Sequence, residues 1–265
     1  MEPKDLATIA ISIFAFLLSL IATTLSLRNK KHDDRRDLRS LLNDSISKIR
    51  TARTDQAKYR VEYAGNQQAE YVASLFNYQI NSLARLAVYI TEQIPSLVTD
   101  IEYATVADAF AWTGDQQKAR QYWDTAISSS KDRYYEIINR RDYANFLFTY
   151  GSVGEGRDQY RRALNLSPVS DDTSKYLTGY TYRMWGVSEH AAGNELSAKE
   201  CFDKAAEAYG TIAVSGFRAF ALADLDQMRQ AAHEGIMSAK LGVGPFEQHS
   251  SAGPALVDPP PPPKY

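Results

Sequence analysis

Few residues of this chain have the types and spacing that catalysis or metal binding requires. The single cysteine, Cys201, lies in an apolar helical pattern, so we interpret it as an unreactive core residue. The histidines are too far apart to share a metal ion, and no Ser-His-Asp arrangement or carboxylate pair stands out. We therefore expect no catalytic residue, no metal and no cofactor, although an active site built from distant residues stays open. The four histidines are His32, His190, His233 and His249.

Two other patterns have residue types that bind anions. Gly151 and Gly156 belong to a glycine-rich run, but no strand pattern precedes it and no lysine with a serine or threonine follows it, so we interpret the run as a turn. Arg141 and Asn145 are four residues apart and would share one face of a helix. With Arg183 on a neighbouring helix, they would form a small, partly cationic patch.

The first long element is an apolar segment at residues 6–27, which reads LATIAISIFAFLLSLIATTLSL and carries no charge. A bilayer core of about 30 Å needs about 20 helical residues, so we expect a transmembrane helix. Only Lys4 precedes the segment, whereas a basic collar follows it, and this asymmetry predicts a body on the cytoplasmic side with residues 1–5 outside. The collar comprises Arg28, Lys30, Lys31, Arg35, Arg36 and Arg39.

The collar has two open interpretations: it contacts anionic lipid, or it only sets the topology. We expect no nucleic-acid binding, because the rest of the chain is acidic and the basic cluster lies next to the membrane segment. The collar continues into a charged linker helix within residues 28–64. Its narrow apolar stripe would pack on the body or pair with a second copy. The stripe comprises Leu38, Leu41, Leu42, Ile46 and Ile49.

The helical body is predicted to span residues 65–240, and within it one helical hairpin pattern recurs three times. Each copy has a turn, at Gly114, Gly151 and Gly193. Small residues recur five and twelve positions after each turn, and an aromatic residue recurs nine positions after it. The small residues would let two helices approach, and the aromatic ring would fill the space between hairpins. The aromatic residues are Trp123, Tyr160 and Phe202.

This pattern resembles the tetratricopeptide repeat over residues 99–209, under half of the chain, with a capping helix to follow at Thr211–Ala232. The turn-to-turn spacing is wider than the regular family has, and the second copy has Gly156 where alanine is usual. The resemblance implies an all-α fold: a stack of helical hairpins behind the N-terminal transmembrane helix.

In this family the first helix of each hairpin lines a concave groove that binds a partner. The resemblance therefore implies that the corresponding positions of this chain line a binding groove. Part of this groove resembles the clamp with which some family members hold the C-terminal carboxylate of a peptide. Where that clamp needs an asparagine, this chain has Met184. The groove residues are Asp108, Trp112, Arg141, Asn145, Phe148, Arg183 and His190.

The last segment, residues 241–265, has a proline-rich composition that predicts disorder, and its end resembles an SH3-type ligand. Together these features predict a non-enzymatic, single-pass membrane scaffold or adaptor that binds a protein partner in its groove. The alternatives are a receptor for incoming polypeptides, a regulatory subunit of a membrane-associated enzyme complex, and an enzyme with a hidden site. Self-association through the linker helix also stays open.

Overall fold

The computed structural model describes residues 3–29, 35–63, 67–167 and 171–233, and side chains within 8–24, 35–63, 70–167 and 171–232. Most of the predicted collar before Arg35 and the proline-rich tail 241–265 lie outside the described residues. In the described part the chain is all-α, as predicted. Its helices are α1 (Pro3–Asn29), α2 (Arg35–Glu62), α3 (Gln67–Gln93), a short 3-10 turn (Pro95–Leu97), α4 (Asp100–Trp112), α5 (Gln116–Ser129), α6 (Arg133–Tyr150), α7 (Val153–Leu166), α8 (Asp172–Ala191), α9 (Glu195–Gly210) and α10 (Ser215–His233).

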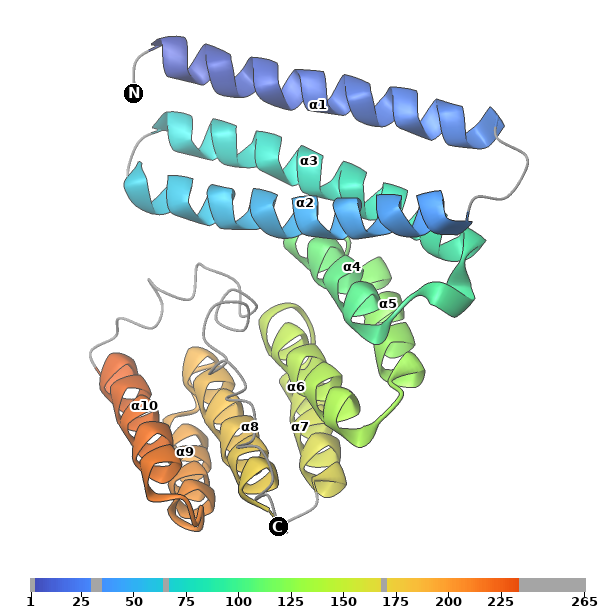
Figure 1. The fold of residues 1–265 in the computed structure, drawn as a ribbon. Helices are drawn as coiled ribbons and strands as arrows, with labels where there is room; N and C mark the ends of the chain where they lie inside the picture. Colours follow the sequence, from blue (N-terminus) through green and yellow to red (C-terminus); the bar gives the residue numbers. More distant parts are fainter. Residues whose placement is uncertain (1–2, 30–34, 64–66, 168–170, 234–265) are drawn as a thin grey trace, which may run out of the picture.

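These helices stack as hairpins in one continuous series (Figure 1). The hairpins are α2–α3, α4–α5, α6–α7 and α8–α9, and the second helix of each hairpin contacts the first helix of the next. The first helices also contact one another in the order α2, α4, α6, α8, and α10 contacts both α8 and α9 as the predicted capping helix would. We call α2, α4, α6 and α8 the inner helices. The expectation of a helical solenoid of stacked pairs is confirmed.

The stack begins with α2 because the apolar stripe of this helix faces the body. Leu42, Ile46 and Ile49 are buried in the main core together with side chains of α3 and α4. Of the two open interpretations of the stripe, the structure supports packing on the body. The α2–α3 hairpin is also longer than the later ones, and α1 lies along α3 on the side away from the rest of the stack (Figure 1).

Among the described residues, none of the helices combines the length and the apolar character needed to cross a membrane.

The positions that define the repeat belong to the core of the stack. Trp123, Tyr160 and Phe202 are buried, and so are the small residues around each of them. In each of these hairpins, the inner helix has a small, buried residue seven positions before the turn. These small residues are Ala107, Ala144 and Gly186.

Two of the three turns follow the predicted chemistry. Gly114 and Gly193 have φ of 90° and 77°, the left-handed region that favours glycine after a helix. Asp115 then caps α5 by accepting a hydrogen bond from the backbone N–H of Lys118. Gly151 differs, because its φ is −134°. A Cβ at Gly151 would meet the guanidinium of Arg120 at 2.6 Å and atoms of Leu147 at 3.2 Å, so a larger residue there would require the Arg120 side chain to move.

We predict that Gly186→Ala destabilises the fold by about 1–3 kcal/mol, because overpacking forces neighbouring groups apart. A Cβ at this position would lie 2.7 Å from the ring of Phe202 and 3.2 Å from the carbonyl oxygen of Ala198. Urea denaturation of the purified protein measures the loss. Gly216→Ala in α10 is the matched control, since a Cβ there meets nothing within 4 Å. An equal loss in both variants would contradict the packing argument.

Candidate partner-binding face on the inner helices

The seven predicted groove residues all lie on inner helices. Asp108 and Trp112 are on α4; Arg141, Asn145 and Phe148 are on α6; Arg183 and His190 are on α8. Three of them, Asp108, Arg141 and Arg183, are buried and have charged partners within the chain. The other four are partly exposed. The structure thus gathers the residues on one series of helices, but charged groups of the chain already occupy part of that series.

Side chains of α2 contact the two predicted groove residues of α4, Asp108 and Trp112. Arg53 forms a buried ion pair with Asp108, and its guanidinium lies 4.8 Å from the centre of the Trp112 ring. The indole Nε1 of Trp112 donates a hydrogen bond to the side chain of Gln56. Gln56 is fully buried and also donates to the carbonyl of Ala73 on α3. One glutamine therefore joins α2, α3 and α4.

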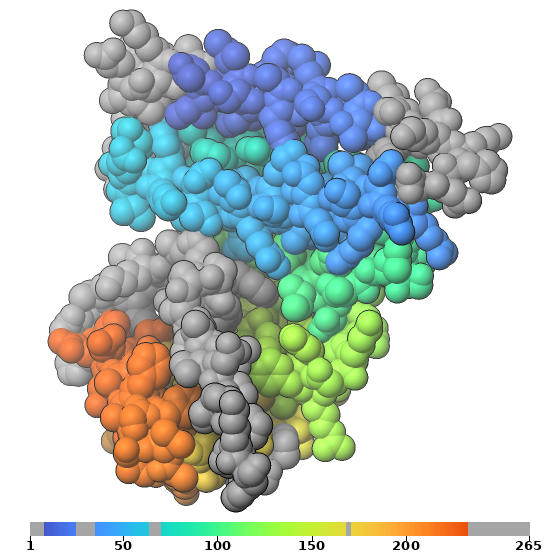
Figure 2. Space-filling model, in the orientation of Figure 1, coloured from blue at the N-terminus to red at the C-terminus, as the bar shows by residue number. Residues whose placement is uncertain are grey.

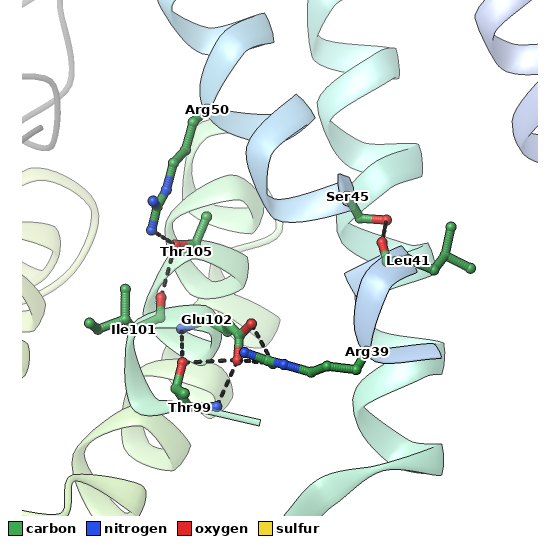
Figure 3. Close-up of polar contacts among 8 residues, drawn as sticks. All are labelled: Arg39, Leu41, Ser45, Arg50, Thr99, Ile101, Glu102 and Thr105. Atoms are coloured by element: carbon green, nitrogen blue, oxygen red, sulfur yellow. Dashed lines mark hydrogen bonds and ion pairs between the residues drawn. The ribbon is translucent and has the colours of Figure 1, made fainter. Parts of the chain in front are cut away.

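The polar contacts between α2 and α4 continue toward the start of α2 (Figure 3). Arg39 donates to both carboxylate oxygens of Glu102 at 2.6 Å, and Glu102 in turn accepts from the backbone N–H of Thr99 in a capping box at the start of α4. Arg50 donates to the hydroxyl of Thr105. Basic residues of α2 thus meet successive polar residues of α4 along most of that helix.

Between α6 and α8, two buried arginines flank one tyrosine. The guanidinium of Arg141 lies 4.6 Å from the ring centre of Tyr180, and that of Arg183 lies 4.3 Å from it. Arg141 also pairs with Asp142, whereas Arg183 pairs with Asp224 of α10. Burial disfavours the charge of Arg183, but Tyr180, Tyr209 and Asp224 outweigh it and raise the pKa of Arg183.

Asn145 and Phe148 help to join α6 to its neighbours. The amide oxygen of Asn145 accepts a hydrogen bond from Ser188 of α8 at 3.3 Å, and Ser188 is 2.9 Å from the hydroxyl of Tyr160. The ring of Phe148 packs beside Tyr160 on α7, with 5.9 Å between ring centres. Asn145 therefore joins its hairpin to the next one, whereas Phe148 holds the two helices of its own hairpin together.

Glu189 is the polar centre of the last hairpin. It is almost fully buried, and it accepts hydrogen bonds from Arg157, Trp185 and Asn194. Burial alone would raise the pKa of Glu189, but these donors outweigh burial and lower the pKa. The neighbouring His190 instead points to Glu195 across the α8–α9 turn, with 2.9 Å between Nδ1 and Oε1.

The accessible part of the face lies where α2, α4 and α6 end. Arg60 lies 5.8 Å from the centre of the Trp112 ring, and its side chain is 37% exposed. Tyr150 is 38% exposed, and the charges of Arg53 and Arg60 oppose the rise that burial causes in the pKa of Tyr150. We call Arg60, Trp112 and Tyr150 the aromatic-cationic cluster. Arginine, tryptophan and tyrosine are the residue types that contribute most to protein interfaces.

Comparison of the chain with protein-family models, with curated proteins and with solved structures finds no match in any of the three. Any account of function therefore rests on the geometry of the inner helices. Within the described residues, no group of histidine, cysteine and acidic side chains could hold a metal ion.

The residues whose role in the stack sequence reasoning missed lie mostly on α2. Arg39, Arg50, Arg53 and Arg60 are spaced so that they share one side of a helix. That spacing was the available signal, but it does not reveal which acids the arginines meet. Asp224 on α10 gave no signal at all, because its partner Arg183 is far away in the sequence.

We predict that Asp108→Asn costs about 3–5 kcal/mol of folding stability, because it leaves the buried charge of Arg53 without its counter-ion. Denaturant unfolding monitored by circular dichroism measures this loss. The matched control is Asp158→Asn, which removes an exposed pair with Arg161 and should cost less than about 1 kcal/mol. Similar costs for the two variants would show that the Arg53–Asp108 pair does not hold α2.

Glu189 generates a prediction for pH. The pKa of Glu189 is lowered in the folded state, so the unfolded chain binds more protons. The ionised carboxylate therefore stabilises the fold above the ordinary glutamate pKa of about 4.3. This stabilisation is lost as the pH falls through the pKa of Glu189 in the folded state. Glu189→Gln should therefore be less stable than the wild type at pH 7, with a difference that shrinks below about pH 4. Stability measured across this range tests it. Glu200→Gln, at an exposed position on α9, should follow the wild-type curve.

Proposed function

We propose that this protein is a membrane-anchored scaffold of the tetratricopeptide type, which holds a protein partner on the accessible part of its inner helices. The observation that carries the proposal is the continuous series of inner helices α2, α4, α6 and α8, with the aromatic-cationic cluster accessible on it. A preformed helical surface suits recognition of another protein, because little ordering is needed on binding.

The tetratricopeptide assignment is supported by the repeat positions. Their small residues and aromatic residues are buried at matching places in three successive hairpins, and two of the turns use a left-handed glycine. Fold alone does not identify a partner, so the binding role is argued from the exposed residues.

The membrane part of the proposal rests on residues 6–27. The segment has no charge, and large apolar side chains of α1 remain exposed on the body. A lipid bilayer would bury them. Crossing the bilayer once, with the body on the cytoplasmic side, follows from the basic residues after the segment. Contact between anionic lipid and the basic residues from Arg28 to Arg36 belongs to the same proposal, whereas Arg39 pairs with Glu102.

The partner site that we propose is narrower than the groove expected from the sequence. Asp108, Arg141 and Arg183 serve the fold, because their charges are buried and paired inside the chain. Arg60 is accessible beside Trp112, and Tyr150 is accessible within reach of the charge of Arg60, so these two are the residues that a partner would contact. The positive charge of Arg60 favours a partner segment that carries acidic residues.

A regulatory subunit of a membrane-associated enzyme complex would use the same face, and so would a receptor for incoming polypeptides. These two alternatives differ from a general scaffold in the partner that they hold. The identity of a bound protein distinguishes them.

We predict that Arg60→Glu combined with Tyr150→Ala reduces partner recovery at least about tenfold, as expected when two interface anchors are lost. The full-length protein is extracted from its native membranes in mild detergent, and bound proteins are quantified. The control is Arg85→Glu, an exposed charge reversal on the outer helix α3. Unchanged recovery with the double variant, or equal loss with the control, would refute the assigned site.

A further inference from the structure

We propose that the α2–α3 hairpin is an internal binding site for the apolar helix α1, and that α1 gives up this site when it enters a lipid bilayer. The inference rests on the membrane attachment proposed above. It adds that the anchor has two mutually exclusive positions. Figure 2 shows α1 as the outermost layer of the described chain, over α2 and α3.

One side of α1 already has a partner on the body. Ile13 is buried, and Ile9 packs against the cluster formed by Tyr59 and Val72 at the α2–α3 end. Phe16 and Leu20 pack against the main core. The ammonium of Lys48 on α2 lies 5.7 Å from the centre of the Phe16 ring. We call Ile9, Ile13, Phe16 and Leu20 the inner stripe of α1.

The opposite side of α1 is equally apolar and has no cover among the described residues. Ile11, Phe14, Leu18 and Ile21 are 68%, 63%, 53% and 56% exposed. Their spacing of three and four residues puts them on one face, which we call the outer stripe. A helix that is apolar on both faces gains by full burial, and the body supplies only half of it. Lipid acyl chains fit the outer stripe because residues 6–27 include no charged group to desolvate.

The two positions of α1 exclude each other. Helix α2 carries Asp44, Lys48 and Arg50, and a docked α1 that crossed the bilayer would bring these charges into the hydrocarbon. When α1 crosses, the inner stripe must therefore leave the hairpin. The hairpin thus covers half of the anchor before a membrane is available.

A cross-linking experiment on the full chain separates the two positions. The protein is made by cell-free synthesis without lipid, with Cys201→Ala and the pair Phe16→Cys and Lys48→Cys. A short bifunctional maleimide is added before or after vesicles of phosphatidylcholine and phosphatidylglycerol. We expect efficient cross-linking without vesicles and a yield about tenfold lower with them, because the bilayer shifts the population away from the docked position.

The matched control replaces Phe14 by cysteine, together with Lys48→Cys. Phe14 belongs to the outer stripe, so this pair should cross-link poorly in both conditions. Flotation of the vesicles after a wash with alkaline carbonate, which removes protein held only at the lipid surface, supplies the second readout: protein cross-linked through positions 16 and 48 beforehand should be washed off, whereas the uncross-linked protein should float.

Each contrary result has a distinct meaning. Equal cross-linking with and without vesicles, or flotation of the cross-linked protein, would overturn the exchange between positions. Poor cross-linking of the Phe16 pair without lipid would overturn the docking site. If the uncross-linked protein failed to float while the Phe16 pair still cross-linked, the proposed membrane attachment would fail and the internal site would stand alone, without the exchange.

Discussion

Helix α4 is buried on nearly every side although it carries three acidic residues, and this burial constrains how the other helices pack. Asp100, Glu102 and Asp108 are each less than 10% exposed. A buried carboxylate is costly unless it is paired and hydrogen-bonded. Glu102 and Asp108 are paired with arginines of α2, and Asp100 accepts a hydrogen bond from Asn139 of α6. The acids of α4 therefore determine which helices lie beside it.

This constraint explains why the chain is a stack that starts at α2. Apolar contacts bring α2 and α3 together, but Arg39 and Arg53 determine where α2 lies on α4. Later hairpins are also joined by an ion pair to a buried acidic residue, because Arg157 of α7 pairs with Glu189 of α8. Charged side chains thus align the hairpins, whereas the aromatic-cationic cluster remains partly exposed.

The repeat could be predicted from sequence because its residues are local and periodic. Gly114 and Gly193 mark turns, and Trp123 and Phe202 follow them at a fixed interval. The pairing of Arg53 with Asp108 could not be predicted, because it joins residues far apart in the sequence and many exposed arginines look alike. For the same reason Arg141 and Arg183 resembled binding residues, although burial and pairing give them structural roles.

Because the ion pairs of Arg39 and Arg53 join α2 to α4, α2 should belong to the folded stack as fully as α4 does. Native-state hydrogen exchange of the full-length protein tests it most directly, because helices that open together have equal opening free energies. We expect the backbone amides around Ile49 and Arg53 to be as strongly protected as those around Val106. Exchange at Ile49 and Arg53 that is at least about a hundredfold faster than at Val106 would contradict it, since α2 would then open by itself.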